Sequence, residues 1–464
     1  MSLFIIRHQH DAARCPAQDP NLGAALLNYL SRPNVAKHGV KIQGEAVVRG
    51  EHTMFMIAEA EDETGLQAFM APFREAGSVD VFPASTCAGV VASNGCAAPS
   101  PGIGEVLALD PEEACQDAID AELVVHRAHP LNCETSVPAL IGGVIMPNAR
   151  FYVRNHFQIP NLNASDYRLA VGGLVKRKLS LNLRDLTQMS SQTFLATLEC
   201  AGNGRSKFDP PTAGEKWDLG AVSTAEWTGV PLTEVLDRAG VESAAREVLF
   251  RGADHGMVEN WSSTIRFERS LGLEEAAVSG AILAYVMNGE PLPIHHGFPL
   301  RLIVPSWYAV ASVKWLTDIE LIGHTFAGHF QSEKYWYKWR RGEGVREPVT
   351  RMQVRALITE PNQGSEIKRG DITIRGVAWS GLAPIERVEV STSGGVWHPA
   401  RLIGEPSRHA WQRLELVTRI DAFGPALLRV RATDKAGRVQ PEHAEWNRLG
   451  YGNNSIQAVA ICVI

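Results

Sequence analysis

Residues 1–84 alternate short apolar, strand-like runs with two amphipathic stretches. The expected elements, in chain order, are a strand at 4–8, a helix at 22–30, strands at 40–48 and 54–59, a helix at 66–76 and a strand at 79–82. This β-α-β-β-α-β order predicts a ferredoxin-like α/β sandwich over residues 1–84. Because this architecture hosts many functions, it does not by itself indicate an activity for residues 1–84.

The pattern disappears at residue 85, where Ala, Gly, Ser and Pro become frequent and no periodicity persists. We therefore predict a linker at 85–122. Residues 123–348 mix short β-prone runs with amphipathic helices such as 232–239, which predicts a mixed α+β domain. Residues 349–464 carry alternating strands separated by Gly, Pro and Asp turns, which predicts an immunoglobulin-like sandwich. Strands are expected at 168–171, 193–199, 248–251, 301–304, 372–377, 387–391, 413–419 and 426–432.

Length and charge agree with this division into three domains. A chain of 464 residues exceeds what one hydrophobic core usually organises. The net charge of −6 implies neither a nucleic-acid partner nor an anionic membrane partner. The apolar runs fall short of the roughly 20 residues that a membrane-spanning helix needs. The N-terminus shows neither a basic region before a long apolar stretch nor a twin-arginine pair, so we expect a cytoplasmic protein, or a periplasmic one only if a leader is missing.

The cysteines indicate neither a disulfide framework nor a zinc motif. Their number is odd and no close CxxC spacing occurs. They stand at positions 15, 87, 96, 115, 133, 200 and 462. No CxxCH motif is present, so we expect no covalent haem in this chain and an electron acceptor elsewhere. At the end of the first strand, His8, His10 and Asp11 are expected to be solvated and not to bind a metal.

The most informative stretch is TLECAGNGR at 197–205, where a β-prone run leads a lone cysteine into a glycine-rich turn. An isolated cysteine is ordinarily a small buried hydrophobe. This stretch, however, resembles the metal-binding segment of the sulfite oxidase family, and further blocks match in family order. They are FYVRNHFQIP, KWDLGAVSTAEWTGVPLTEVL, LAYVMNGEPLP, HHGFPLRLIVP and SVKWL. The resemblance runs from about residue 130 to the C-terminus, where STSGGVW, ATDKAGRVQP and EWNRLGYGNN are similar to that family's dimerisation domain.

The resemblance implies a molybdenum ion held by one molybdopterin and by the thiolate of Cys200. A thiolate suits such a soft, redox-active site better than a carboxylate would. The residues that the resemblance implies as cofactor-binding are Arg154, Asn155, His156, Cys200, Asp254, His296, Arg301, Ser312 and Lys314.

Substrate-handling residues are implied in the same way. Arg154 and Arg205 match positions that draw an oxyanion to the metal, a task suited to permanently charged, two-pronged guanidinium groups. Trp217 matches a pocket-lining tryptophan, whereas Trp227 is expected in the core. Arg448 is similar to an arginine that the sandwich domain contributes to the anion pocket, with its local order shifted by one residue.

Two departures from the family pattern bear on the substrate more than on the cofactor. Trp261 stands where many members carry a tyrosine that hydrogen-bonds near the metal, and an indole N–H donates but does not shuttle a proton as a phenol does. Ser306 replaces a glycine of the pterin segment, and Tyr308 follows close behind it. Either Trp261 or Tyr308 takes the place of the family's tyrosine.

We therefore expect an oxygen-atom transfer enzyme that oxidises an anion such as sulfite to sulfate and passes electrons to an external acceptor such as a cytochrome. The chain is expected to form a homodimer, and its first domain is similar to dimeric α/β-barrel modules that pair sheet to sheet. The alternatives are a reductase of nitrate or a sulfoxide on the same cofactor, or a non-catalytic pterin-binding regulator. Retention of Cys200 with Arg154 and Arg205 argues against the regulator.

Overall fold

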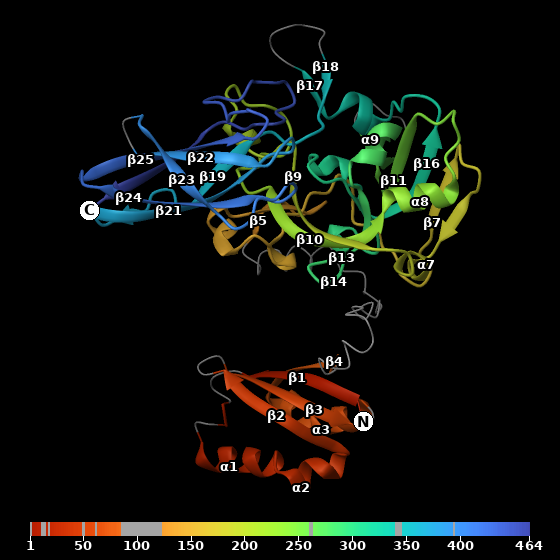
Figure 1. Ribbon diagram of the computed structural model, residues 1–464, viewed down its shortest axis with the longest axis vertical. Helices are drawn as coiled ribbons and strands as arrows, with labels where there is room; N and C mark the ends of the chain where they lie inside the picture. Colours follow the sequence, from red (N-terminus) through yellow and green to blue (C-terminus); the bar gives the residue numbers. More distant parts are fainter. Residues whose placement is uncertain are drawn as a thin grey trace. The chain divides into compact units, whose positions relative to one another are not determined.

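The computed structural model describes residues 2–10, 15–16, 19–48, 52–60, 63–84, 123–258, 263–338, 346–392 and 395–464. The chain forms two compact units that divide between residues 99 and 100 (Figure 1). The predicted linker at 85–122 and Trp261 lie outside the described residues. In the part of the chain that is described, no helix is long and apolar enough to cross a membrane.

The N-terminal unit has the element order that the sequence predicts. Its elements are β1 (Ser2–His10), α1 (Pro20–Tyr29), α2 (Arg32–Val35), η3 (Ala36–His38), β2 (Val40–Val48), β3 (Thr53–Ala60), α3 (Glu63–Phe69), α4 (Ala71–Ala76) and β4 (Gly77–Ala84). The strands form an antiparallel sheet in the order β2-β3-β1-β4. The helices lie on one side of this sheet (Figure 1).

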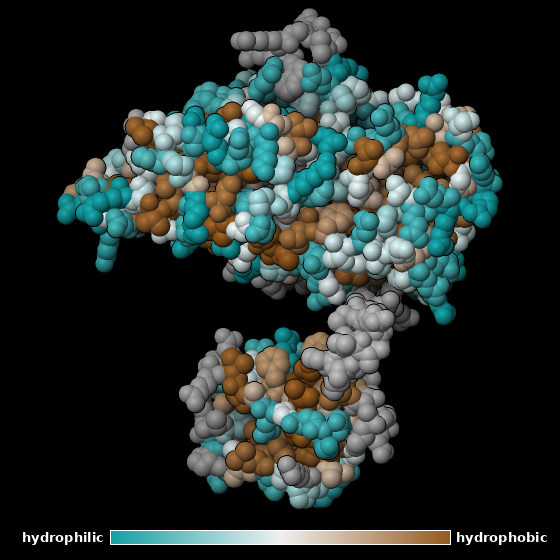
Figure 2. All heavy atoms as spheres, viewed as in Figure 1, coloured by the Kyte–Doolittle hydropathy of each residue, from teal (hydrophilic) through white to brown (hydrophobic). Residues whose placement is uncertain are grey.

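Strand alternation decides which side chains of the N-terminal sheet are buried. Along β1, Phe4 and Ile6 are buried, whereas Ile5 between them is exposed, because successive side chains point to opposite faces. Figure 2 shows hydrophobic residues at the surface of this unit beside hydrophilic ones. The same alternation buries His8, which is 4% exposed, so the expectation of a solvated histidine is wrong at this position.

The second unit is a mixed α+β structure. One of its sheets has the order β14-β13-β10-β9 with β15 paired to β13, and another has the order β12-β11-β16-β7-β8. The strands of these sheets are β7 (Leu169–Gly173), β8 (Leu179–Leu181), β9 (Gln192–Glu199), β10 (Val222–Pro231), β11 (Glu247–Gly256), β12 (Ile265–Gly272), β13 (Ile282–Met287), β14 (Glu290–Pro291), β15 (Arg301–Ile303) and β16 (Leu316–Ile322). The helices α7 (Leu183–Thr187), α8 (Leu232–Ala239) and α9 (Leu273–Val278) connect them, and two strand pairs stand apart, β5 (Leu123–Arg127) with β6 (Asn132–Thr135) and β17 (Trp336–Lys338) with β18 (Arg346–Pro348).

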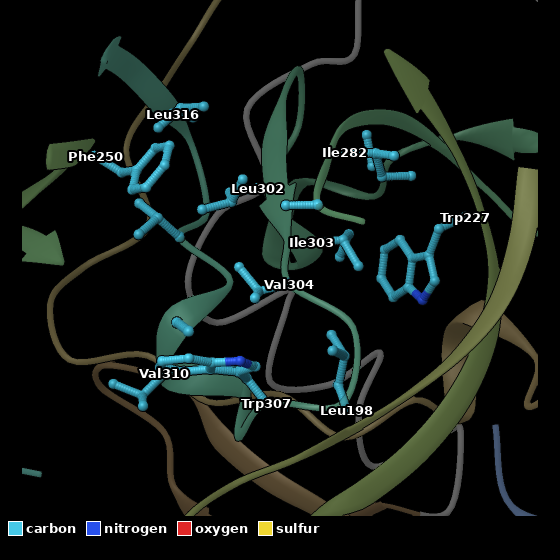
Figure 3. Packing of buried hydrophobic residues seen from close by; sticks show 14 of the residues in the cluster. Leu198, Trp227, Phe250, Ile282, Leu302, Ile303, Val304, Trp307, Val310 and Leu316 are labelled. Atoms are coloured by element: carbon cyan, nitrogen blue, oxygen red, sulfur yellow. The ribbon is translucent and has the colours of Figure 1, made fainter. Parts of the chain in front are cut away.

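The short strand β15 joins the packing of these two sheets. Figure 3 shows Leu302 beside Phe250 and Leu316, while Ile303 points the other way toward Ile282 and Trp227. Trp227 itself is fully buried, which confirms its predicted place in the core. All three residues of β15 are therefore buried, and the segments on either side of this strand both contribute to the pocket described below.

The C-terminal strands form one curled, eight-stranded sheet in the order β19-β21-β24-β23-β22-β25-β26-β20. They are β19 (Arg355–Glu360), β20 (Glu366–Ile367), β21 (Gly370–Trp379), β22 (Ile385–Thr392), β23 (Trp397–Ile403), β24 (Gln412–Ile420), β25 (Gly424–Asp434) and β26 (Gln457–Val463). This sheet has a core of its own, built around residues such as Val388 and Val430. Trp379 and Trp411, however, belong to the large core that begins at Leu140, so the sheet is packed firmly against the preceding part of the unit.

Candidate active site

Cys200 stands at the point where β9 leaves the sheet. The last four residues of β9 are buried, and Glu199 pairs with Val222 of β10. The N–H of Cys200 donates to the carbonyl of Ala221 at 2.9 Å, and the carbonyl of Cys200 accepts from the N–H of Asn203 at 2.9 Å. These main-chain bonds fix the turn that carries the thiol without involving the sulfur atom.

The Glu199 carboxylate anchors this turn to the C-terminal sheet. It accepts hydrogen bonds from Arg355 Nη1 at 3.1 Å, Trp379 Nε1 at 2.9 Å and Asn203 Nδ2 at 3.1 Å. The ion pair with Arg355 is almost completely buried, since the two side chains are 2% and 3% exposed. Burial raises the pKa of Glu199, and the charge of Arg355 opposes that rise. The position of the thiol therefore depends on residues of β19 and β21.

The thiol opens into a pocket that collects every residue predicted to bind the cofactor. Arg154, Asn155, His156, Cys200, Asp254, His296, Arg301, Ser312 and Lys314 all line it. Its apolar wall includes Leu198 and Val310, which Figure 3 shows at the lower edge of the packed core. Burial raises the pKa of the Cys200 thiol, and the positive charges of Arg154 and Arg205 oppose that rise. These charges favour the thiolate that a metal ion needs.

Two cations at the pocket wall are oriented by carbonyl groups and not by carboxylates. Arg301 donates from Nη1 to His296 O at 2.8 Å and from Nη2 to Ser312 O at 3.3 Å. Lys314 Nζ donates to Asn155 Oδ1 and, at 2.9 Å, to His295 O. Burial lowers the pKa of Arg301 to about 10 and that of Lys314 well below its ordinary value. Neither cation forms an ion pair with a carboxylate among the described residues, so an anionic ligand would be the counter-charge that favours the protonated form of both.

Several buried polar atoms around the pocket lack a hydrogen-bond partner among the described residues. They are Arg301 Nε, Asp254 Oδ1 and His295 Nδ1. Buried polar groups are almost always hydrogen-bonded in folded proteins, so such atoms indicate a polar ligand. A thiol, two unneutralised cations and unpaired polar atoms fit molybdopterin, which offers a soft metal, a phosphate and a ring edge rich in donors and acceptors.

Asp254 is expected to make the stability of the cofactor-free protein depend on pH. Burial raises the pKa of this carboxyl from 3.8 to about 7, and the charge of Lys314 opposes the rise. The folded protein therefore holds a proton that the unfolded chain releases between about pH 4 and pH 7, so the free energy of unfolding falls as the pH rises through this window, by at most about 1.4 kcal/mol per pH unit. In Asp254→Asn, the thermal unfolding midpoint should fall less between about pH 5 and 7 than it does in the unchanged protein. An equal fall in both proteins would contradict the raised pKa of Asp254.

Tyr335 is a pocket residue that sequence reasoning missed. Its hydroxyl group lies 2.6 Å from His156 Nε2, and its ring stacks on Tyr451 with centroids 5.0 Å apart. Burial lowers the pKa of His156, so the imidazole is neutral. The backbone of Tyr335 adopts a φ of 58°, an uncommon value for a residue other than glycine. The only sequence signal is the aromatic run at 335–337, which no matched family block contains.

Arg205 lies beside the thiol-bearing turn but is not part of the pocket wall. Its Nε donates to Leu449 O at 3.2 Å and its Nη1 donates to Glu215 O at 3.0 Å. The guanidinium packs directly on Gly202, where an added β-carbon would lie 2.5 Å from both terminal nitrogens. Only glycine permits this approach, so Gly202 brings the arginine's charge close to the thiol.

The structure does not bring three other predicted residues to the pocket wall. Trp217 is fully buried and packs edge-on against His126, with ring centroids 5.0 Å apart. Tyr308 is buried, and its hydroxyl accepts the N–H of Gln353 at 3.3 Å. Arg448 is exposed, whereas Asn447 before it is buried and Leu449 after it is partly buried. Trp261 lies outside the described residues, and the phenols that line the pocket are those of Tyr152 and Tyr335.

Family models match three parts of the chain. The oxidoreductase molybdopterin binding domain matches residues 156–330, the Mo-co oxidoreductase dimerisation domain matches residues 346–464, and a domain of unknown function (DUF3303) matches residues 3–94. The two matches to molybdenum oxidoreductase domains both lie in the larger unit, which contains the pocket.

Curated relatives and a solved structure agree with these matches. Mitochondrial sulfite oxidase from Macaca fascicularis is 35% identical over 74% of this chain and 66% of its own length, so this chain spans about two thirds of that relative. Sulfite oxidase from Arabidopsis thaliana is 32% identical over 73% of this chain and 93% of its own length. The crystal structure of the sulfane dehydrogenase SoxCD from Paracoccus pantotrophus aligns with a TM-score of 0.64 and 30% identity, over 71% of this chain and 84% of that chain. With a thiol at the end of β9 and a cationic pocket around it, this chain belongs to the sulfite oxidase family of molybdopterin-dependent oxidoreductases.

Proposed function

We propose that this chain oxidises sulfite to sulfate and passes the electrons to an external acceptor. The observation that carries the proposal is the pocket that the Cys200 thiol enters beside Arg154, Arg301 and Lys314. A small oxyanion and an anionic cofactor both require positive charge in such a place. The proposal is tested by measuring molybdenum and pterin content together with acceptor reduction by sulfite. We expect about one molybdenum per chain and reduction of the acceptor when sulfite is added. If the molybdenum-loaded protein reduces no acceptor with sulfite, sulfite is not its substrate.

In this proposal the pocket divides into a metal side and a phosphate side. Cys200 would hold the metal, Arg301 and Lys314 would hold the phosphate, and His296 and Ser312 would help to hold the pterin. When bound, the cofactor supplies two-electron oxygen-atom transfer, which side chains alone do not provide. The unpaired Arg301 Nε is the donor best placed to gain a hydrogen bond when the cofactor binds.

The remaining side chains handle the substrate. Arg154 is held at the pocket wall by Asn132 Oδ1, which accepts from its Nη1 at 3.2 Å, and this guanidinium attracts the anion. Tyr335, hydrogen-bonded to the neutral His156, offers a phenol that holds its proton, because burial raises the pKa of this hydroxyl group. Phe267 stacks on His156 with ring centroids 4.8 Å apart and excludes water from this pair. Charges fixed in a partly dry pocket act more strongly than they would in water.

Arg154→Met is expected to raise the KM for sulfite about tenfold or more, because a charge-assisted hydrogen bond contributes roughly 1.5–3 kcal/mol. Rates are to be expressed per bound molybdenum, so that any loss of cofactor is separated from loss of anion binding. Lysine should rescue only in part, since it restores the charge without the two-pronged geometry. Reduction of a neutral sulfoxide should change much less.

The matched control for this experiment is Arg168→Met, because Arg168 is exposed and donates only to backbone carbonyls. Its sulfite kinetics should equal those of the unchanged protein. Arg205→Met extends the series to the arginine that packs on Gly202. Unaltered sulfite kinetics in fully loaded Arg154→Met would show that the substrate is not held as an oxyanion at this wall.

The proposal extends to the arrangement of domains. Residues 1–84 form a ferredoxin-like sandwich, for which the strand order β2-β3-β1-β4 is the support, and residues 349–464 form an immunoglobulin-like sandwich after the domain at 123–348. The chain pairs as a homodimer through residues 346–464, which match the dimerisation model. A cytochrome is the proposed acceptor, no haem is expected within this chain, and a cytoplasmic location stays a prediction.

A further inference from the structure

Three side chains with metal-binding groups meet at one end of the N-terminal sheet. His10 ends β1, His52 precedes β3, and Cys15 lies between β1 and α1. One ligand atom from each residue lies within 4.8 Å of the other two. The sheet itself holds the two histidines together, since Gln9 pairs with Thr53 and the N–H of His10 donates to His52 O at 3.2 Å.

A chain of hydrogen bonds prepares His10 for a metal ion. His8 Nδ1 lies 3.0 Å from the carbonyl oxygen of Ser78, which accepts only, so this nitrogen carries the proton. His8 Nε2 then bears a lone pair, and His10 Nδ1 donates to it at 3.2 Å. The lone pair of His10 is consequently left on Nε2. Metal-bound histidines usually donate their other ring N–H in this manner, which fixes both tautomer and orientation.

The backbone of His52 gives a second indication of a ligand site at this end of the sheet. Its φ is 49°, in the left-handed region that residues with a side chain seldom adopt. Such conformations persist where the surrounding structure imposes them, and they cluster at ligand sites. The side chains of His10, Cys15 and His52 are all partly exposed, so an ion has a path to them.

We propose that His10 Nε2, the Cys15 thiolate and the His52 imidazole bind a zinc ion, with a fourth position open to water. Two nitrogens and one sulfur are a donor set that zinc takes in tetrahedral sites, and binding displaces the proton of the Cys15 thiol. His8 is a positioning residue that acts through His10. In tetrahedral zinc sites the donor atoms are roughly 3.3–3.8 Å apart, so zinc binding brings the three donor atoms closer together by at most roughly 1.5 Å.

This site is independent of the molybdenum pocket in both residues and chemistry. No regular cysteine or histidine spacing in the sequence indicates this site, because the pairing of β1 with β3 is what brings His52 to His10. A zinc ion here has no ligand in common with Cys200. The two proposals can therefore fail separately.

The test titrates cobalt(II) as a spectroscopic probe into the full-length, molybdenum-loaded protein after treatment with a chelator. One equivalent should bind with a thiolate-to-cobalt charge-transfer band, and zinc should displace it. Cys15→Ser should abolish the band, whereas Cys462→Ser, which alters an exposed cysteine, should not. The band should also persist in Cys200→Ser, which separates this site from the molybdenum ligand.

The histidine variants complete the series. His10→Gln and His52→Gln should each weaken zinc binding at least 100-fold, and His8→Gln should weaken it about 10- to 100-fold, as loss of an outer-shell partner typically does. His398→Gln, at an exposed histidine of β23, is the control and should leave affinity unchanged. An unaltered circular dichroism spectrum and thermal unfolding profile of each variant would show that the N-terminal unit remains folded. A band that survives Cys15→Ser, or zinc affinity that His10→Gln leaves unaffected, would overturn the proposal.

Discussion

Cys200→Ser is expected to abolish molybdenum-dependent turnover while the protein remains folded. A serine hydroxyl is a harder ligand with a far higher pKa than a thiol, so it does not replace a thiolate on a soft, redox-active metal. The turn itself should persist, since the bonds of residue 200 to Ala221 and Asn203 use main-chain atoms only. Molybdenum analysis, sulfite-dependent acceptor reduction and thermal unfolding are the three measurements.

The control for the Cys200 variant is again Cys462→Ser, because Cys462 is exposed and lies on β26. Its metal content and turnover should match those of the unchanged protein. Full turnover in Cys200→Ser with normal molybdenum content would remove the thiol from the metal site. A Cys200→Ser protein that unfolds would instead indicate that the sulfur matters for packing, which the small size of the change makes unexpected.

Arg355→Met is expected to produce the largest loss of stability among single changes around the site, about 3–5 kcal/mol in the free energy of unfolding. The substitution leaves the buried Glu199 carboxylate with hydrogen bonds from Trp379 and Asn203 but without its counter-charge. Because Glu199 precedes Cys200, cofactor content should fall as well. Denaturant unfolding at pH 8, followed by tryptophan fluorescence, measures the loss.

The pH dependence of Arg355→Met provides the internal check. Burial already raises the pKa of Glu199, and removal of Arg355 should raise it further. The folded variant then takes up a proton that the unfolded chain lacks, so the lost stability should return as the pH falls toward 5. Glu199→Gln combined with Arg355→Met should restore part of it at pH 8. Arg375→Met, which breaks surface ion pairs with Glu360 and Glu415, should leave the midpoint unchanged, and an equally unchanged Arg355→Met would contradict the role of the buried pair.

Local pattern was enough to predict most of the elements. Helix α8 spans Leu232–Ala239 as predicted, and β2 spans Val40–Val48 as predicted. Both depend on the periodicity of apolar positions over a few residues, which the sequence contains directly. The same holds for the pocket residues that lie in contiguous blocks, such as the block around Arg154 and the block around Arg301, because each block is a short rigid segment between buried strands.

The sequence by itself determined the order of the elements, the cysteine at the end of β9 and the set of pocket residues carried by recognisable blocks. The tertiary structure alone decided which distant side chains meet them. It pairs Glu199 with Arg355, brings Tyr335 to His156, and leaves Trp217, Tyr308 and Arg448 away from the pocket wall. It also gathers His10, Cys15 and His52. These contacts join residues that strand pairing and burial bring together from far apart in the chain, and no local periodicity records which partners will meet.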